Sequence, residues 1–344
     1  MKPSDDPIAY LTLALVPGIG PTRLERLKSR FDTWNGALEA PFESLRTVPS
    51  ISLAAATAIG QASRKRTEQI VAEVARLGGF VMLPDDSAYP AMFAGMPDPP
   101  TALFGLGRKE LLAQPAVAIV GSRHPSTYGV SVTRTVSKMA AEGGLVVVSG
   151  MARGLDAVAH WAAVAASGGT IGVLGNGLGV VYPAANKALY QRVEREGLLL
   201  TEYPPGEKPH AGSFPQRNRL ISALARVTLV VEAAHKSGAL RTVGSALEQG
   251  REVLCVPGPI TSRTSHGVND LIRSGAAPYL EPEDLLRFYP EVSAAYRAAL
   301  AKDEPSEALR SQLREELRLV FDAVDGVPRT VDALADQLKL GPGP

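Results

Sequence analysis

The sequence has little from which a covalent or metal-dependent site could be built. Its single cysteine, Cys255, excludes an intrachain disulfide. The apolar run around it, VLCVP, favours a buried, inert thiol over a nucleophile. The five histidines form no HExxH pair, and no Cys/His zinc spacing occurs. We therefore expect no metal site.

An excess of charge of one sign is also absent. The chain has 36 Lys and Arg against 35 Asp and Glu, a formal net charge of +1. This balance excludes a basic coat over the whole surface, so a site for a polyanion must be a local patch. Residues 211–273 offer one, with eight Lys and Arg against four Asp and Glu.

The longest uncharged run, 157–186, contains no Asp, Glu, Lys or Arg. Six glycines interrupt its second half, which favours a buried helix followed by a strand over a membrane span. The N-terminus, MKPSDDPIAY, lacks the apolar stretch of a signal peptide. The expectation is a soluble, cytoplasmic protein without membrane contact.

The 344 residues predict two or three domains. Residues 1–80 show helical spacing, and residues 81–288 alternate apolar runs with helical patterns. Uniformly apolar strands separated by helices are typical of a parallel sheet covered on both faces, so we expect an α/β, Rossmann-like doubly wound domain. The predicted strands are 116–120, 145–149, 170–174, 198–201, 227–231 and 252–256.

Residues 289–344 begin with a charged linker, after which Leu309, Leu313, Leu317 and Phe321 share one helix face. A turn and a second short helix (VDALADQLKL) follow. This order predicts a helix-turn-helix module that lacks a third, recognition helix.

Near the N-terminus, PGIGPTRL places Gly18 and Gly20 between two helical segments, which is the pattern of a helix-hairpin-helix. Glycines would let this hairpin approach a phosphate closely. A plain tight turn is the alternative, because TVPSIS (47–52) is at best a degenerate second copy and no internal repeat is visible.

In a doubly wound sheet, ligands bind where the strands end. The first predicted strand is followed by Gly121, Ser122, Arg123 and His124 rather than by GxGxxG, so a nicotinamide or flavin cofactor is not expected. The loop instead offers a hydroxyl and a guanidinium suited to phosphate. The alternative is an arginine that caps a helix. Gly150, Gly175, Ser237 and Gly238 follow other strands and could likewise expose backbone to phosphate.

The run Phe214-Pro215-Gln216-Arg217-Asn218-Arg219 is the most informative. Arginines for phosphates beside an aromatic ring for a base are typical of single-strand recognition. Alone the run is weak, because the two arginines could form salt bridges with Glu232 or Glu202. Together with Arg123 at a neighbouring strand end, it favours a binding site.

Taken together, the segments that follow the predicted strands resemble the DNA processing protein A (DprA or Smf) family. His160 lies in one of these segments, SGMARGLDAVAH (149–160), and is interpreted as a core residue. The similar segments occur in the same order: VAIVGSRHPSTYG (117–129), SGMARGLDAVAH (149–160), GTIGVLGNGLGVVYPAAN (169–186), TEYPPG (201–206), FPQRNRLISALA (214–225), VVEAAHKSGALRT (230–242) and GREVLCVPGP with GVNDLIRSGA (250–276).

The resemblance implies a non-enzymatic protein that binds and protects incoming single-stranded DNA during natural transformation and helps to load the RecA recombinase. It implies a homodimer formed through the Rossmann-like domain, an N-terminal SAM-like domain and a partial C-terminal winged-helix module, with weak duplex binding by the terminal domains. Family members often have a lysine shortly before the phenylalanine, and the nearest candidates for it in this sequence are Lys208 and His210. The implied DNA-binding residues are Ser122, Arg123, His124, Lys208, Phe214, Arg217, Asn218 and Arg219, with phosphate-loop residues Gly121, Gly150, Gly175, Ser237 and Gly238.

Two other functions are the alternatives. A phosphoribohydrolase-like enzyme of the same Rossmann superfamily would need a catalytic glutamate, but Ser245 stands at that place in SGALRTVGS. A purely structural adaptor that acts through the two helical ends would leave the Arg and Phe residues without a role.

Overall fold

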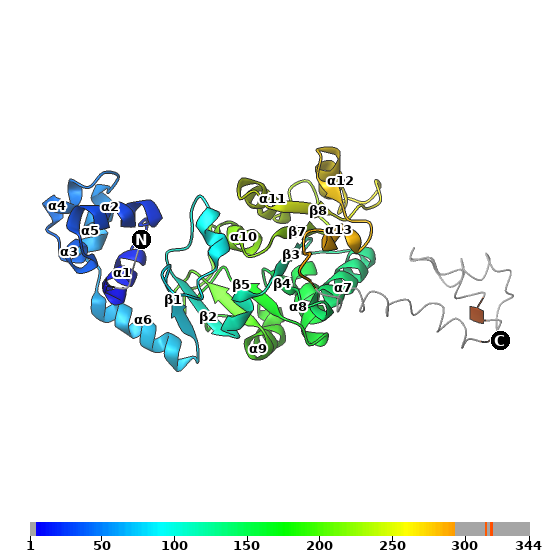
Figure 1. Cartoon of the computed structure of the whole chain (residues 1–344), viewed down its shortest axis with the longest axis horizontal. Helices are drawn as coiled ribbons and strands as arrows, with labels where there is room; N and C mark the ends of the chain where they lie inside the picture. Colours follow the sequence, from blue (N-terminus) through cyan, green and yellow to red (C-terminus); the bar gives the residue numbers. More distant parts are fainter. Residues whose placement is uncertain (1–4, 293–313, 315–316, 319–344) are drawn as a thin grey trace.

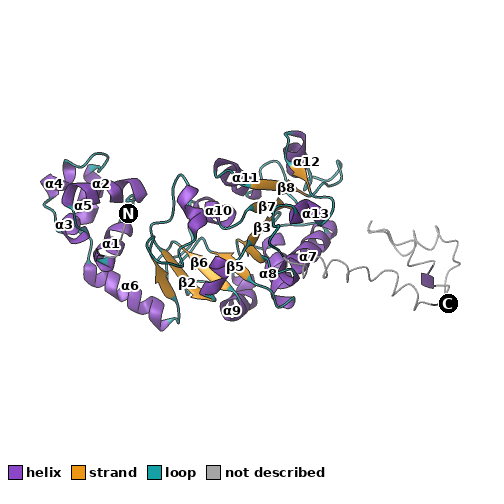
Figure 2. Ribbon diagram, viewed as in Figure 1, coloured by secondary structure: helices purple, strands orange, loops and turns teal. Residues whose placement is uncertain are grey.

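The computed structural model describes residues 5–292 together with 314, 317 and 318. The predicted C-terminal module of residues 289–344 therefore lies almost entirely outside the described residues. The described chain forms an N-terminal helical unit joined to a larger α/β unit (Figure 1, Figure 2). No described helix has the length and apolar character needed to cross a bilayer.

The N-terminal helical unit packs around its own core, which includes the ring of Trp34 against Tyr10. Pro21 occupies the first turn of its second helix, where a missing N–H costs nothing. The last helix also packs on the α/β unit, where Ile70 and Val74 lie against Phe104. The helices are α1 (Pro7–Ala14), α2 (Pro21–Phe31), α3 (Trp34–Leu38), α4 (Phe42–Arg46), α5 (Leu53–Gly60) and α6 (Arg64–Arg76).

Within residues 5–292, nine strands form one sheet in the order β1-β2-β6-β5-β4-β3-β7-β8-β9. The strands are β1 (Phe80–Met82), β2 (Leu103–Gly107), β3 (Ala116–Val120), β4 (Val146–Ser149), β5 (Thr170–Val173), β6 (Leu198–Thr201), β7 (Val227–Val230), β8 (Glu252–Cys255) and β9 (Ala277–Pro278). All six predicted strands are present, and β3 to β9 run parallel to one another, while β6 also pairs antiparallel with β2. The expectation of a wholly parallel sheet needs correction, because β1 and β2 pair antiparallel at one edge.

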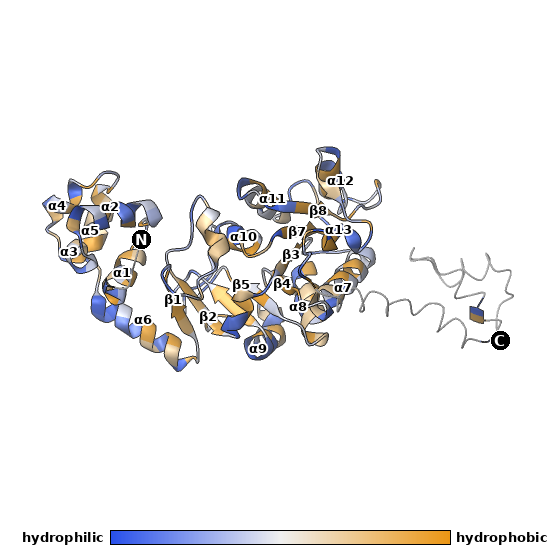
Figure 3. Cartoon of the chain, in the orientation of Figure 1, coloured by the Kyte–Doolittle hydropathy of each residue, from blue (hydrophilic) through white to orange (hydrophobic). Residues whose placement is uncertain are grey.

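Helices cover both faces of this sheet because its strands are apolar on both sides. Along β3, Ala116, Ala118 and Val120 face one core, while Val117 and Ile119 face the other. The strands are correspondingly among the most hydrophobic segments in Figure 3. One face is covered by α7 (Thr127–Glu142), α8 (Leu155–Ala165), α9 (Lys187–Glu196) and α13 (Glu283–Leu286), the other by α10 (Ser213–Ala223), α11 (Ala239–Glu248) and α12 (His266–Arg273). Three short 3₁₀ segments complete the unit: η2 (Ala91–Gly95), η3 (Lys109–Ala113) and η4 (Ala184–Asn186).

Two single-residue predictions about the core are confirmed. Cys255 is buried, and burial raises the pKa of its thiol to about 12. His160 is also buried, with Nδ1 2.7 Å from the Thr170 hydroxyl, and burial lowers its pKa to about 3. Both groups are therefore uncharged at neutral pH.

Near the C-terminal end of the α/β unit, Tyr289 packs into the core and links β3 to β7. The Tyr289 hydroxyl donates to the Ala116 carbonyl at 2.7 Å and accepts from the Val227 amide at 3.2 Å. Ala116 and Val227 are the first residues of their strands. Tyr289 and Val292 thus pack into the α/β core beyond the expected domain limit at 288.

Candidate functional site

Two adjoining cavities open at the carboxyl edge of the parallel strands. The chain order reverses between β3 and β7, and a crevice forms there because the loops leave in opposite directions. A cavity of about 550 Å³, here the switch-point cavity, lies between the loops that follow these two strands. A second cavity of about 450 Å³, here the aromatic cavity, lies across β4 and β5. Residues that line both are Arg123, Ala152, Phe214 and Arg217.

A buried carboxylate anchors the loop that follows β3 through hydrogen bonds. Glu232, at the end of β7, accepts hydrogen bonds from the Ser126 amide and hydroxyl and from the Thr264 hydroxyl. Gly129 is required here because a Cβ at this position would lie 2.5 Å from the Glu232 carboxyl carbon. Ser126 also caps α7 by accepting from the Gly129 amide. The anchored loop therefore presents the residues before Ser126 at a fixed place.

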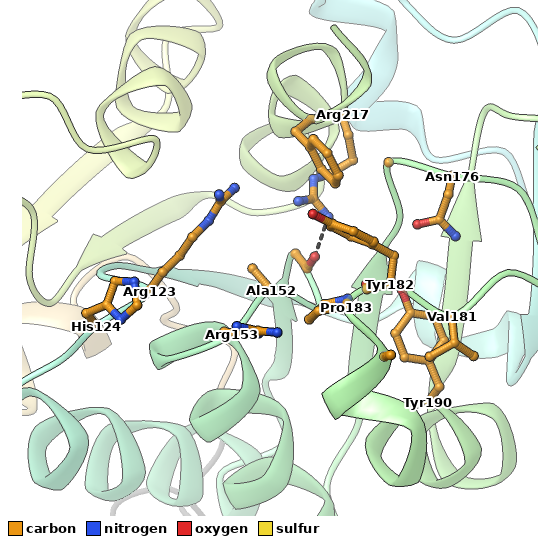
Figure 4. Close-up of a pocket in the computed structure, with 14 residues that line it drawn as sticks. Arg123, His124, Ala152, Arg153, Asn176, Val181, Tyr182, Pro183, Tyr190 and Arg217 are labelled. Atoms are coloured by element: carbon orange, nitrogen blue, oxygen red, sulfur yellow. Dashed lines mark hydrogen bonds between the residues drawn. The ribbon is translucent and has the colours of Figure 1, made fainter. Parts of the chain in front are cut away.

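Arg123 projects from this loop into the space that the two cavities share (Figure 4). It is exposed and pairs with no carboxylate among residues 5–292. The neighbouring Ser122 lines the switch-point cavity and accepts from the His124 amide at 3.1 Å, while His124 is exposed beside the aromatic cavity. The arrangement leaves the Arg123 guanidinium free to bind an anion.

Arg217 occupies a different environment, although it also lines both cavities. It is only 4% exposed, and its guanidinium donates to the carbonyls of Gly150, which follows β4, and Val173, which ends β5. Its charge faces Asp156, a buried carboxylate that accepts from the Gly150 amide at 3.1 Å and the Ala152 amide at 3.4 Å. Its Nε also donates to the Asn218 side chain at 3.3 Å, so three of its five N–H donors are used inside the protein.

The structure does not bring Arg219 or Lys208 to either cavity. Arg219 donates to the buried carboxylate of Glu202 at 2.7 Å and lies 3.6 Å from Asp98. Burial raises the pKa of Glu202, and the charge of Arg219 opposes that shift. For Arg219, the structure thus has the salt bridge with Glu202 that the sequence offered as the alternative to ligand binding. Lys208 is exposed on the loop before α10.

Two aromatic rings stand at the rim of the aromatic cavity. Phe214 lies in the first turn of α10, and its ring centroid is 5.3 Å from that of Tyr182, which is 48% exposed. Gly175 leaves room for the phenylalanine, because a Cβ there would lie 3.0 Å from the ring. Exposed ring faces of this kind can stack on planar bases.

The predicted phosphate-loop residues all line a cavity, but the glycines also meet needs within the protein. A Cβ at Gly121 would lie 2.5 Å from Leu155, and one at Gly150 would lie 2.7 Å from both Arg217 and Asp156. Ser237 accepts from the Ala239 amide at 3.3 Å, and the Gly238 carbonyl accepts from the Asn218 side chain at 3.4 Å. Lining the switch-point cavity are Gly121, Asn218, Ser237 and Gly238; lining the aromatic cavity are Gly150 and Gly175.

The same edge receives the positive ends of two helices. α8 begins after Gly154 and α10 after Gly212, and neither N-terminus is capped by a side chain. Backbone N–H groups of an uncapped first turn favour anions. The buried Asp156 in the first turn of α8 offsets one of these ends, so the N-terminus of α10 and the exposed arginines are what favour an anion at this edge.

Sequence reasoning missed several residues at this edge. Arg153, Lys236 and Arg241 line the cavities, are exposed and have no acidic partner within residues 5–292. Arg153 lines the aromatic cavity together with Tyr182 and Pro183 (Figure 4). All of them, including Tyr182, lie in runs that carry the family resemblance, so reading every cation and ring in those loops would have found them. No group of three His, Cys, Asp or Glu side chains in the described part of the chain could hold a metal ion.

Comparison with known proteins identifies a family whose model matches this chain. Residues 80–290 match the family model of DNA recombination-mediator protein A. The chain is 38% identical over 282 residues to Protein Smf of Synechocystis sp., a match that covers 80% of this chain and 71% of that protein.

Two solved structures are similar. DNA processing protein A from Streptococcus pneumoniae superposes with a TM-score of 0.71 at 33% identity, covering 81% of this chain and 97% of that one. DNA processing protein A from Helicobacter pylori, studied for its single-stranded DNA binding mode, gives 0.57 at 30% identity and covers 62% and 96%.

Proposed function

Because this chain belongs to the DNA recombination-mediator protein A family, we propose that it binds single-stranded DNA at the carboxyl edge of its sheet. The observation that carries the proposal is Arg123, an exposed guanidinium without an acidic partner in the described chain, placed between the two cavities. Phosphates would meet Arg123, Arg153, Lys236 and Arg241, and bases would meet Phe214 and Tyr182. The H. pylori relative with its single-stranded DNA binding mode supports this choice of ligand.

Binding without a chemical reaction is part of the proposal. The two buried carboxylates nearest the cavities are already engaged. Asp156 accepts from two amides and faces the charge of Arg217, and Glu232 accepts from Ser126 and Thr264. Ser245, where a phosphoribohydrolase would carry its glutamate, is half-buried on α11. A general acid or base free to act on a nucleotide is therefore lacking among these groups.

Replacing Arg123 by alanine tests the site. A charge-assisted contact contributes about 1.5–3 kcal/mol, so we expect Arg123→Ala to weaken binding of labelled oligo-dT by roughly 10–100-fold. The salt slope of log K should fall by about 0.7, the value for one phosphate of a single strand. Fluorescence anisotropy at two salt concentrations measures both quantities.

Arg134→Ala is the matched control, because Arg134 is an exposed arginine on α7 that lines neither cavity. It should bind oligo-dT like the wild type. Equal affinities of the wild type and Arg123→Ala would refute the proposed site. Release of a free base from a nucleoside monophosphate would favour the enzyme instead.

A homodimer formed through the α/β unit is the second part of the proposal. Three apolar side chains stand exposed on elements around β8 and β9: Leu247, Ile260 and Leu280, which are 62%, 85% and 72% exposed. Exposed apolar groups beside a sheet edge favour an interface between proteins.

We expect the wild type to elute as a dimer and Leu280→Asp as a monomer in size-exclusion chromatography with light scattering. Leu53→Asp, at an exposed leucine of α5 in the other unit, is the control and should remain dimeric. A wild type that is monomeric at micromolar concentration would contradict the dimer.

The cellular role that follows is protection of incoming single strands in natural transformation and delivery of those strands to RecA. Family membership supports a role in recombination. The SAM-like character of the helical unit and the winged-helix character of residues 289–344 belong to the same proposal. Stimulation of RecA assembly on oligo-dT, and its loss in Arg123→Ala, would test the delivery step.

A further inference from the structure

The switch-point cavity has a closed floor. Val120 at the end of β3, Ile221 of α10 and Ala239 of α11 line it, and all three side chains are buried. Helices α10 and α11 pack against each other, so the floor offers no passage between them. A linear polymer that enters this cavity must therefore end in it or turn back.

Three hydroxyl groups line the cavity, and none of them donates a hydrogen bond within the described chain. The Ser122 hydroxyl accepts from the His124 amide at 3.1 Å, and the Ser237 hydroxyl accepts from the Ala239 amide at 3.3 Å. Thr242 is only 2% exposed, yet its hydroxyl has no hydrogen-bond partner of either kind among the described residues. Buried polar groups are normally paired, so this hydroxyl points to a ligand that supplies the acceptor.

The first turn of α11 borders the same space. Gly238, Ala239 and Thr242 all line the cavity, and the helix begins without a side-chain cap from Gly238. The Gly238 amide has no acceptor within residues 5–292, and no heavy atom lies within 4 Å of the place where a Cβ of Gly238 would stand. A ligand can thus approach the backbone here, and the start of a helix favours an anion.

The exposed charges around the cavity are positive. Arg123, Lys236 and Arg241 line it, and none of them pairs with a carboxylate within residues 5–292. Asp156 is the only acidic residue in the described lining, and it is buried and faces the charge of Arg217. A phosphate monoester carries a charge of about −1.5 to −2 near neutral pH and presents three terminal oxygens. Three cations and three hydroxyl donors suit it better than an internal phosphodiester, which has less charge and fewer free oxygens.

We propose that the switch-point cavity binds a terminal phosphate monoester, carried either by the end of a DNA strand or by a free nucleoside monophosphate. An internal phosphate continues into chain on both sides, which the closed floor does not accommodate, whereas a terminal phosphate enters as an end. Phe214 lines both cavities, so its ring stands where the base next to that phosphate would lie. For the strand end the proposal rests on the proposed single-strand binding, and for the free nucleotide it stands without it.

Thr242→Val tests the site, because it removes the hydroxyl and keeps the shape of the side chain. The ligands are internally labelled oligo-dT with a 5′-phosphate, with a 3′-phosphate, and an unphosphorylated strand one nucleotide longer, which has the same number of phosphate groups. We expect the wild type to bind one of the phosphorylated strands about tenfold more tightly than the unphosphorylated one, as for a charge-assisted contact. Thr242→Val should lose most of this preference but unfold in urea like the wild type, because the hydroxyl has no partner in the protein. Lys236→Ala, an exposed change, should reduce the preference as well.

Thymidine 5′-monophosphate distinguishes the two sources. Competition by this nucleotide, but not by thymidine, identifies a free nucleoside monophosphate as a ligand, whereas a preference for a phosphorylated strand without such competition identifies the strand end.

The matched control is Ser245→Ala, which removes another hydroxyl of α11 from a residue that lines neither cavity, and it should keep the preference. Equal binding of the three strands by the wild type, without binding of the nucleotide, would overturn the proposal, as would a Thr242→Val protein with the full preference. Affinity for the unphosphorylated strand would still support the proposed single-strand function in both cases. Binding of the nucleotide without binding of any strand would refute that function and leave the phosphate site.

Discussion

Replacing Arg217 by alanine is expected to lower the free energy of unfolding by about 3–5 kcal/mol, because it leaves two buried carbonyls without their donor and the buried Asp156 without the positive charge that faces it. The guanidinium joins the ends of β4 and β5 through Gly150 and Val173. Burial lowers the pKa of Arg217 and raises that of Asp156, and the charge of each opposes the shift of the other. Urea unfolding of the wild type and the variant measures the loss.

A double-mutant cycle separates this role from contact with DNA. Arg217→Met combined with Asp156→Asn removes both charges, so the double variant should lose less stability than the sum of the two single variants. Single-strand affinity should then be measured at a temperature where the variants are folded. An Arg217→Ala protein with wild-type stability but without affinity for oligo-dT would show that the residue contacts DNA directly.

Removing the two rings at the aromatic cavity should produce the largest loss of single-strand affinity. Each stacked base contributes about 1–3 kcal/mol, so Phe214→Ala alone should weaken binding of oligo-dT by roughly 5–150-fold. The double variant with Tyr182→Ala should lose more, but less than the product of the two effects, because the rings lie 5.3 Å apart and support each other. Anisotropy titrations at fixed salt measure these losses.

The salt dependence distinguishes stacking from phosphate contact. The slope of log K against log salt should be unchanged in Phe214→Ala, whereas it should fall in Arg123→Ala. Phe214→Leu is the matched control, since it keeps an apolar side chain but removes the π face. Wild-type affinity in Phe214→Leu would mean that the ring acts only through packing.

The sequence predicted the central sheet well because its strands are buried on both faces and therefore continuously apolar. The limits of β3 and β6 agree with the predicted ranges 116–120 and 198–201. β1 and β9 are three and two residues long, too short for any periodicity to appear. β2, with the sequence LFGLG, contains two glycines, and its place is set by pairing with β6.

The candidate site was harder to predict, because residue type does not reveal what a side chain will meet. Arg123, Arg217 and Arg219 are equivalent as residues, yet one is exposed, one is tied to two carbonyls and one is paired with Glu202. Arg123 and Phe214 are 91 residues apart in the sequence, and the strand order of the sheet places both of them beside the same two cavities. Their proximity therefore follows from the topology of the sheet. The sequence suggested Glu202 and Glu232 only as salt-bridge partners of the two arginines. In the fold, Glu202 pairs with Arg219, whereas Glu232 accepts hydrogen bonds from Ser126 and Thr264.

In the N-terminal helical unit, residues 13–27 correspond to residues 45–59, each position displaced by 32 along the chain, so the expectation of no internal repeat was wrong. This repeat was missed for a different reason. Motif reasoning gave weight to Gly18 and Gly20, which the second copy replaces with Ser50 and Ser52. The positions that both copies preserve are the buried ones, Val16 with Val48 and Ile19 with Ile51. An alignment of apolar spacing, rather than of glycines, would have found it.

Tyr289 bonds the first residues of β3 and β7, so Val292 lies near the amino edge of the sheet, whereas both cavities open at the carboxyl edge. Five residues of β3, about 17 Å, separate the two edges. A linker attached directly after Val292 therefore starts on the side away from the proposed strand path. Immobilising residues 1–292 through such a linker should leave the cavities facing solution, which makes this end the better anchor for single-molecule measurements.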